Sequence, residues 1–185
     1  MASSNTAILS HHSKYTSTSL KRRVFPKHFE LDLESSTICE RVTCIKECPF
    51  NPAFFVVGYQ SGLLSFYSTH YSTPRFTIRV ESGVCHVVWS DTRPVVLYVL
   101  EQRNGTMHVF DLAECVDCSV YQVELGDGVD VFDVGVSLSS LGGGGAGSRW
   151  ILYGDASGNV GKCRIDQGLN ELQGDEKSQL ESLFI

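Results

Sequence analysis

The sequence predicts an all-β chain built from about three copies of one strand-and-turn unit, with a disordered N-terminal leader and a short C-terminal helix. Three observations predict it. Similar segments recur at an offset of 42 to 43 residues, each copy alternates short apolar runs with turns, and the turns carry Gly or Pro at matching places. Apolar runs of this length, bounded by Gly and Pro, are typical of β-strands.

The first two copies are "VTCIKECPFNPAFFVVGYQSGLLSFYS", which begins at Val42, and "VCHVVWSDTRPVVLYVLEQRNGTMHVFD", which begins at Val84. A third copy runs from about Val129 to Asp166, and the insert "LSSLGGGGAGS" lengthens its offset by about ten residues. The matched positions are Pro52 with Pro94, Gly62 with Gly105 and Gly158, and Tyr67 with Phe110 and Cys163. The pattern is therefore an internal repeat.

Each copy has the same order of parts. A first strand such as "CHVVWS" leads through a Pro-containing turn to a mostly apolar second strand, such as "VVLYVL". That strand suits burial on both faces between neighbouring sheets. A polar turn ending in Gly follows, where Gly supplies the positive φ that a tight hairpin requires. A third strand such as "TMHVFDL" closes the unit.

A period near 43 residues lies within the 40–45 residues of a WD40 propeller blade. Phe110–Asp111 stands where the Trp-Asp dipeptide falls in a typical blade. The fold class predicted is a partial WD40 β-propeller. Its expected parts are a leader at 1–23, an edge strand or linker from a preceding blade at 24–41, blades at 42–80, 84–125 and 129–167, and a helical tail at 168–185.

Three blades form too short an arc to close, because propellers have four to eight blades. We therefore expect either a longer protein or completion against another chain. The predicted blade signature is structural rather than catalytic, and it consists of Pro52, Gly62, Trp89, Pro94, Gly105, Phe110, Asp111 and Gly158. The two tryptophans are expected in blade packing.

Composition limits the class of partner. The formal net charge of −6 argues against nucleic acid as the main partner. The longest apolar run, Val95–Leu100, is far shorter than the roughly 20 residues of a membrane span, so we expect no membrane insertion. The N-terminus lacks the apolar core of a secretory signal. An odd number of cysteines, seven, then favours reduced thiols in the cytosol.

No motif predicts an enzyme or a cofactor. Gly142–Gly147 satisfies G-x-G-x-x-G literally, but a strand follows it where a dinucleotide site needs a helix, so we interpret it as a loop. The C-x-x-C pair of Cys115 and Cys118 has the spacing of half a zinc site or of a redox pair, and reduced thiols are the simpler interpretation. His86 and His108 lie on predicted strands, where a structural role is the default. We expect no metal, and a small-molecule ligand is disfavoured.

The repeats resemble the last blades of dynein intermediate chains. The resemblance covers roughly 25–184 and rests on "CPFNPAFFVVGYQSGLLSFYS" followed by "VVWSDTRPVVLYVLEQRNGTMHVFDL". Within the family it is most similar to the intermediate chain of cytoplasmic dynein 2, the retrograde motor of intraflagellar transport. The tail "DEKSQLESLFI" resembles the short helix that follows the last blade there. The family's extended N-terminal segment, which binds light chains, has no counterpart here.

The resemblance implies a non-catalytic scaffold whose propeller docks on a dynein heavy chain, within a complex that also holds other intermediate and light chains. It implies the cytoplasm, the cytoskeleton, and the cilium or flagellum with its basal body. Two alternatives stay open. One is a generic cytosolic WD40 adaptor for protein–protein interaction, and the other is an enzyme with a cofactor at the Gly142–Gly147 loop.

Overall fold

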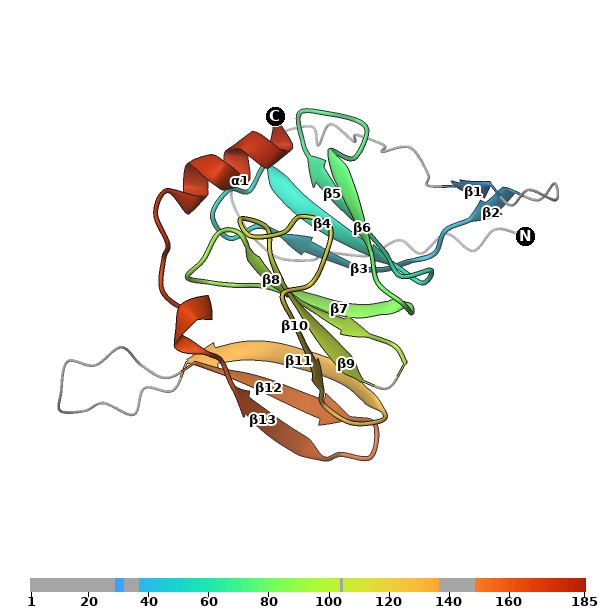
Figure 1. Cartoon of the computed structure of the whole chain (residues 1–185). Coiled ribbons are helices and arrows are strands. Elements are labelled where there is room, and N and C mark those ends of the chain that lie inside the picture. The colour runs from blue at the N-terminus through green and yellow to red at the C-terminus, as the bar shows by residue number, and fades with distance from the viewer. Residues whose placement is uncertain (1–28, 32–36, 104, 137–148) are drawn as a thin grey trace, which may run out of the picture.

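The computed structural model describes residues 29–31, 37–103, 105–136 and 149–185. Most of its strands form three antiparallel sheets, which Figure 1 shows stacked one after another along the chain. The first sheet holds β3 (Val42–Glu47), β4 (Phe54–Tyr59), β5 (Leu63–Ser68) and β6 (Phe76–Arg79). The second sheet holds β7 (Val84–Trp89), β8 (Val96–Glu101), β9 (Thr106–Asp111) and β10 (Tyr121–Glu124). The third sheet holds β11 (Val129–Val136), β12 (Arg149–Asp155) and β13 (Val160–Arg164).

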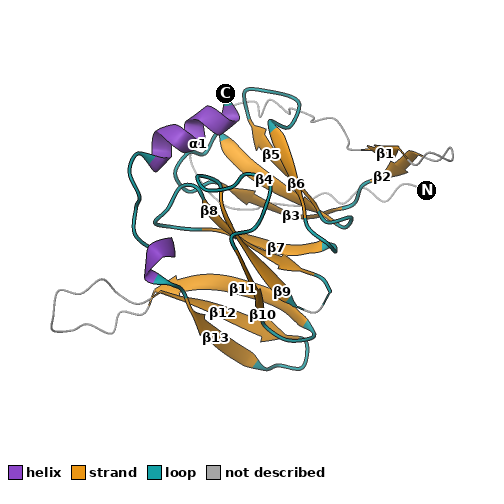
Figure 2. Cartoon of the chain, in the orientation of Figure 1, coloured by secondary structure: helices purple, strands orange, loops and turns teal. Residues whose placement is uncertain are grey.

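Two short elements flank the sheets. Before them, β1 (Phe29–Leu31) pairs with β2 (Thr37–Cys39) in a two-stranded sheet of their own. After them come a 3₁₀ turn, η1 (Gln167–Leu169), and a helix, α1 (Glu176–Phe184), so the described helical residues all lie in the last part of the chain (Figure 2). No described helix is long and apolar enough to cross a membrane. The leader expected at 1–23 lies outside the described residues.

Each sheet is a meander of sequential strands. The neighbours run β3-β4-β5-β6 in the first sheet, β7-β8-β9-β10 in the second and β11-β12-β13 in the third. Strand β7 contacts β3 on one side and β11 on the other, so the first strand of every sheet lies at the same inner edge. This is the stacking of propeller blades, and the predicted fold class of a partial WD40 propeller with a short C-terminal helix is confirmed.

The core lies between the sheets, with the second sheet in the middle. Every residue of β8 is buried, as expected for an apolar strand covered on both faces. Side chains of the first sheet pack on one face of the second, where the Phe66 ring meets Trp89 edge-on at 6.3 Å between centroids. Residues of the third sheet pack on the other face, where His86 meets Phe132 edge-on at 5.5 Å.

The sequence patterns missed one strand per complete sheet. We expected three strands in each unit, but β6 and β10 add a fourth to the first and second sheets. Both are four residues long, and each exposes polar side chains between its apolar ones. Such an outer strand produces too few apolar positions for the alternation to stand out.

Candidate functional site

The signature glycines lie in the turns between the second and third strands of the sheets. Gly62, Gly105 and Gly158 have φ of +86°, +56° and +86°. At Gly62 an added Cβ would lie 2.6 Å from the backbone oxygens of both Val80 and Ser82. The positive φ and the close approach of the β6–β7 link both require glycine there. These turns set the rim of the sheets.

The Pro and Trp positions build the turn between the first and second strands. Trp89 is 6% exposed at the end of β7, and its Nε1 donates a hydrogen bond of 2.8 Å to the carbonyl oxygen of Pro94. Pro52 is exposed in the corresponding turn of the first sheet. Phe110 is buried in β9. The structure thus places Trp89 and Phe110 in blade packing.

Asp111, the last residue of β9, belongs to a buried ionic cluster with Arg93 and Glu176. The Nη2 of Arg93 lies 2.8 Å from Oδ2 of Asp111 and 2.6 Å from Oε1 of Glu176, and the side chains are 2%, 8% and 0% exposed. The Nη1 of Arg93 also donates to the carbonyl oxygen of Gly168 at 3.1 Å. Burial by itself lowers the pKa of Arg93, but the two carboxylates outweigh it and the pKa is raised.

This cluster, the Arg93 cluster, fastens the C-terminal segment to the second sheet. Asp175 caps α1 by accepting from the Ser178 amide at 3.3 Å, and Glu176 follows in the first helical turn. At the other end of α1, the Phe184 ring stacks on Phe54 of the first sheet at 4.2 Å. Helix α1 therefore lies across the strand ends of both sheets (Figure 1). The cluster's role is structural, and no sequence pattern pointed to Arg93 or Glu176.

A polar groove of about 730 Å³ opens on the opposite rim, where the link between β6 and β7 meets the outer half of the second sheet. We call it the rim groove. Its lining is almost entirely polar: Glu81, Ser82, Glu101, Arg103, Thr106, His108, Gln122, Val123 and Glu124. Three carboxylates face one guanidinium, so the field in the groove favours a cation.

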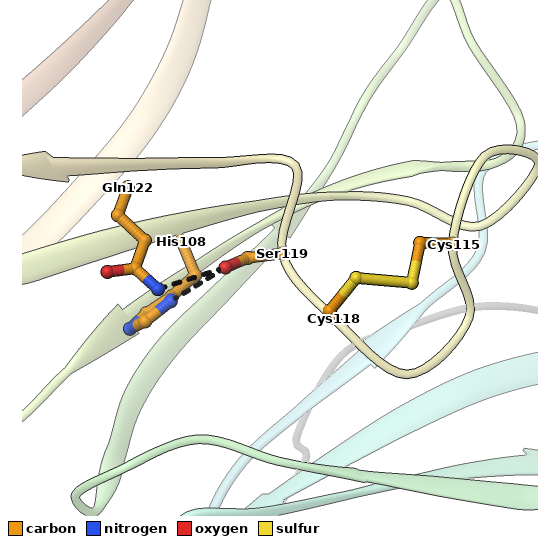
Figure 3. The surroundings of a disulfide bond; sticks show 5 residues. All are labelled: His108, Cys115, Cys118, Ser119 and Gln122. Carbon is orange, nitrogen blue, oxygen red and sulfur yellow. Dashed lines mark hydrogen bonds between the residues drawn. A yellow bond between two sulfur atoms is a disulfide. The ribbon is translucent and has the colours of Figure 1, made fainter.

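Two buried side chains, His108 and Glu101, form the floor of the rim groove. The Nδ1 of His108 lies 3.3 Å from the hydroxyl of Ser119, and Gln122 donates to the same hydroxyl at 3.2 Å, as Figure 3 shows. The Nε2 of His108 lies 3.3 Å from Oε2 of Glu101, but the angles do not form a hydrogen bond, so this buried nitrogen has no hydrogen-bond partner among the described residues. The other oxygen of Glu101 accepts from the Ser82 amide at 2.9 Å.

The C-x-x-C pair overturns the prediction of reduced thiols. Cys115 and Cys118 form a disulfide in the loop that connects β9 to β10, near Ser119 (Figure 3). Their Cα atoms lie 5.7 Å apart, within the range that a disulfide spans, because the loop turns back on itself there. The spacing of the two cysteines in the sequence did not predict that the loop bends in this way.

The remaining described thiols are free: Cys44, Cys48, Cys85 and Cys163. Burial raises the pKa of Cys44, Cys48 and Cys85, which keeps them protonated and unreactive. Within the described ranges, no group of three His, Cys, Asp or Glu side chains could hold a metal ion. The Gly142–Gly147 loop lies outside the described residues.

Comparisons with known proteins agree with this geometry at the level of the fold. No family model matches the chain. The meiosis-specific APC/C activator protein AMA1 of Saccharomyces cerevisiae is 27% identical in an alignment over 82 residues that covers 38% of this chain and 14% of that protein.

Two of the solved structures that are similar to the chain illustrate the fold. The crystal structure of Sqt1 from Saccharomyces cerevisiae superimposes with a TM-score of 0.54 and 14% identity over 75% of this chain and 34% of its own. The structure of Hsv2 from Kluyveromyces lactis gives a TM-score of 0.46 and 10% identity over 71% of this chain and 34% of its own. The chain thus spans about a third of Sqt1, a WD40 propeller protein, and it has the fold of part of a WD40 β-propeller.

Proposed function

We propose that the chain is a non-catalytic scaffold for protein–protein interaction and that the rim groove is its contact surface. The observation that carries the proposal is the groove itself, a polar hollow of about 730 Å³ with exposed carboxylates at its mouth. The WD40 fold supports a binding role, because its rigid sheets hold such rim loops in fixed positions.

The charges of the groove select the partner's chemistry. Glu81 and Glu124 are exposed, so they attract a basic side chain, and the free energy needed to remove water from them on binding is small. Deeper in the groove, the Glu101 carboxylate forms part of the floor beside the His108 ring, where it can accept a hydrogen bond from a Lys or Arg head group. The groove therefore suits a partner segment that carries basic residues.

Charge reversal at the mouth tests this proposal. The probe is a short fluorescent peptide in which arginine alternates with serine, and its binding to the full chain is followed by anisotropy at several salt concentrations. Glu81→Lys with Glu124→Lys is expected to weaken binding and flatten its salt dependence. Glu181→Lys, on the exposed face of α1, is the matched control. Equal binding by all three proteins would refute the rim groove as the contact surface.

At a finer level, we propose that this scaffold serves a dynein motor, as a dynein intermediate chain that docks on the heavy chain in retrograde intraflagellar transport. The support is the order of motifs in the sequence, from the "CPFNPAFF" turn through "VVWSDTRP" to "MHVFDL". A cytoplasmic and ciliary location, including the basal body, and contacts with other intermediate and light chains belong to this proposal. A general WD40 adaptor is the alternative.

Affinity capture of the tagged chain from ciliated cells separates these two. Quantitative mass spectrometry of wild type and of the Glu81→Lys, Glu124→Lys variant is expected to show a dynein heavy chain with the former and less with the latter. A soluble chain that captures other proteins and no motor subunit would contradict the dynein role and favour the general adaptor.

A further inference from the structure

The third sheet lacks a strand that the other two possess. In the first sheet β6 pairs with the outer edge of β5, and in the second sheet β10 pairs with the outer edge of β9. Within the described part of the chain, no strand pairs with the outer edge of β13, and the chain continues instead into η1. The edge of β13 is therefore open where its two counterparts are covered.

At this edge, backbone amide and carbonyl groups point away from β12, where another strand could bond to them. The Ile165 amide donates to the Arg149 carbonyl at 3.0 Å, and bonded and non-bonded pairs alternate along an antiparallel ladder. Cys163 consequently bonds toward β12, while the amide and carbonyl groups of Lys162 and Arg164 point outward. Unpaired groups in a row are a template for another strand.

The face of β13 that is directed toward the second sheet is apolar. Gly161 and Cys163 lie in register with Tyr153 and Ile151 on this face. A cleft of about 200 Å³ separates β13 from the outer half of the second sheet. It is lined mainly by apolar groups, including Met107, Val109, Val123, Ile151, Cys163 and Ile165. An added strand would direct every second side chain into this cleft, where an apolar residue fits.

The opposite face of β13 carries the two basic side chains of Lys162 and Arg164 beside the exposed Val160. Lys162 and Arg164 are exposed, and the Lys162 ammonium lies over the Trp150 ring at 5.0 Å from its centroid. The acidic group at the end of this strand, Asp166, is engaged in capping, because its Oδ1 accepts from the Gly168 amide at 2.8 Å. Cross-strand neighbours of opposite charge stabilise a sheet, so the intervening side chains of an added strand would be acidic.

We infer that the outer edge of β13 is a docking site for an extended segment of a partner protein, in which apolar residues alternate with acidic residues. The segment adds a fourth strand to the third sheet, places its apolar side chains in the cleft, and pairs its carboxylates with Lys162 and Arg164. This inference deepens the proposed interaction function, but it concerns a second surface with the opposite charge preference from the rim groove.

Peptide binding to the full chain tests the inference. The probe is a short fluorescent peptide in which valine alternates with glutamate, and its partner probe alternates valine with lysine. The valine–glutamate peptide is expected to bind about tenfold or more tightly than the valine–lysine peptide, because two cross-strand pairs change from attraction to repulsion. Lys162→Glu should reduce this preference, whereas Lys177→Glu on the exposed face of α1 should leave it intact.

Hydrogen exchange locates the bound peptide. Binding is expected to slow exchange of the Lys162 and Arg164 amides while leaving that of Cys163, already bonded to β12, nearly unchanged. N-methylation of alternate peptide residues should abolish binding. Equal affinity for both peptides, no binding of either, or slowed exchange only elsewhere would overturn the inference. Protection of the Lys162 and Arg164 amides in the free chain would also overturn the inference. Protection that is independent of protein concentration would mean that a segment of the same chain covers the edge, and protection that rises with concentration would mean that a second copy covers it.

The two proposals fail independently. Glu81→Lys with Glu124→Lys should leave the valine–glutamate peptide bound, because these residues lie on the rim groove and not on β13. A variant that loses binding only of the arginine–serine peptide is altered in the rim groove. A variant that loses binding only of the valine–glutamate peptide is altered at the edge of β13.

Discussion

The second and third sheets show how the same repeat unit behaves when, among the described residues, a neighbouring sheet covers both of its faces or only one. Strand β8 of the second sheet is buried at every position because a sheet covers each face. In β12, the equivalent strand of the third sheet, Leu152 is 45% exposed. The second sheet also holds the Arg93 cluster, whereas the ion pair of Arg149 with Asp91 near the third sheet is more exposed. Buried contacts are thus concentrated in the middle sheet, and the third sheet keeps more of its side chains exposed.

The largest expected effect comes from breaking the Arg93 cluster. Arg93→Ala leaves two carboxylates without their cation and should lower the free energy of unfolding by about 3–5 kcal/mol. Arg149→Ala removes the more exposed pair and should cost less than about 1 kcal/mol. Urea unfolding of the full chain measures both, and equal losses would contradict the contrast between buried and exposed pairs.

Removing the same apolar side chain from the two equivalent strands sharpens the comparison. Leu100→Ala in β8 deletes a side chain that is 0% exposed and should cost about 2–5 kcal/mol, because it leaves a cavity. Leu152→Ala in β12 deletes one that is 45% exposed and should cost less than about 1 kcal/mol. A larger loss at Leu152 than at Leu100 in thermal or urea unfolding would mean that the third sheet is covered in solution.

Two turn glycines with the same φ of +86° separate conformational strain from crowding. Gly158→Ala, in open space, should cost about 1–2 kcal/mol for the left-handed backbone alone. Gly62→Ala should cost more, because the added Cβ meets two carbonyl oxygens at 2.6 Å. Equal costs by urea unfolding would mean that the β6–β7 link moves aside freely.

The smallest effect is expected at Asp155, the last residue of β12, whose side chain bonds the turn that leads to β13. Hydrogen bonds from the Asn159 side chain and backbone, and from Ser157, lower the pKa of Asp155. A lowered pKa in the folded state contributes stability above about pH 4 that is lost as the pH falls through the folded value. Asp155→Asn should therefore be slightly less stable than wild type at pH 7, and the difference should shrink as the pH falls below about 4. A difference independent of pH would contradict this assignment.

Local patterns predicted what depends on local chemistry. The apolar run of β8, the turn glycines at Gly62 and Gly105, and the helix in the tail all follow from periodicity and turn residues. The Arg93–Glu176 hydrogen bond joins residues 83 positions apart, and no local pattern records such a pair. Arg93 stands between the polar residues Ser90–Thr92 and the apolar run that begins at Val95, so its local sequence resembles an ordinary exposed turn.

The rim groove was also beyond the sequence, for a similar reason. His108 was expected to be structural, and it lies in a floor built with Glu101 and Ser82 from two other segments. The prediction of reduced thiols at Cys115 and Cys118 was wrong because the pairing of β9 with β10 sets the bend of the loop that brings the two residues together. Sites formed by the stacking of units are visible only once the stacking is known.

Residue-resolved hydrogen exchange of the free chain tests the contrast between the middle and outer sheets most directly. We predict that amides of β8 (Val96–Glu101) exchange only through global unfolding, while the outward amides of Lys162 and Arg164 exchange orders of magnitude faster. Protection at Lys162 and Arg164 equal to that of β8 would contradict the account, because it would mean that the third sheet is as completely covered as the second.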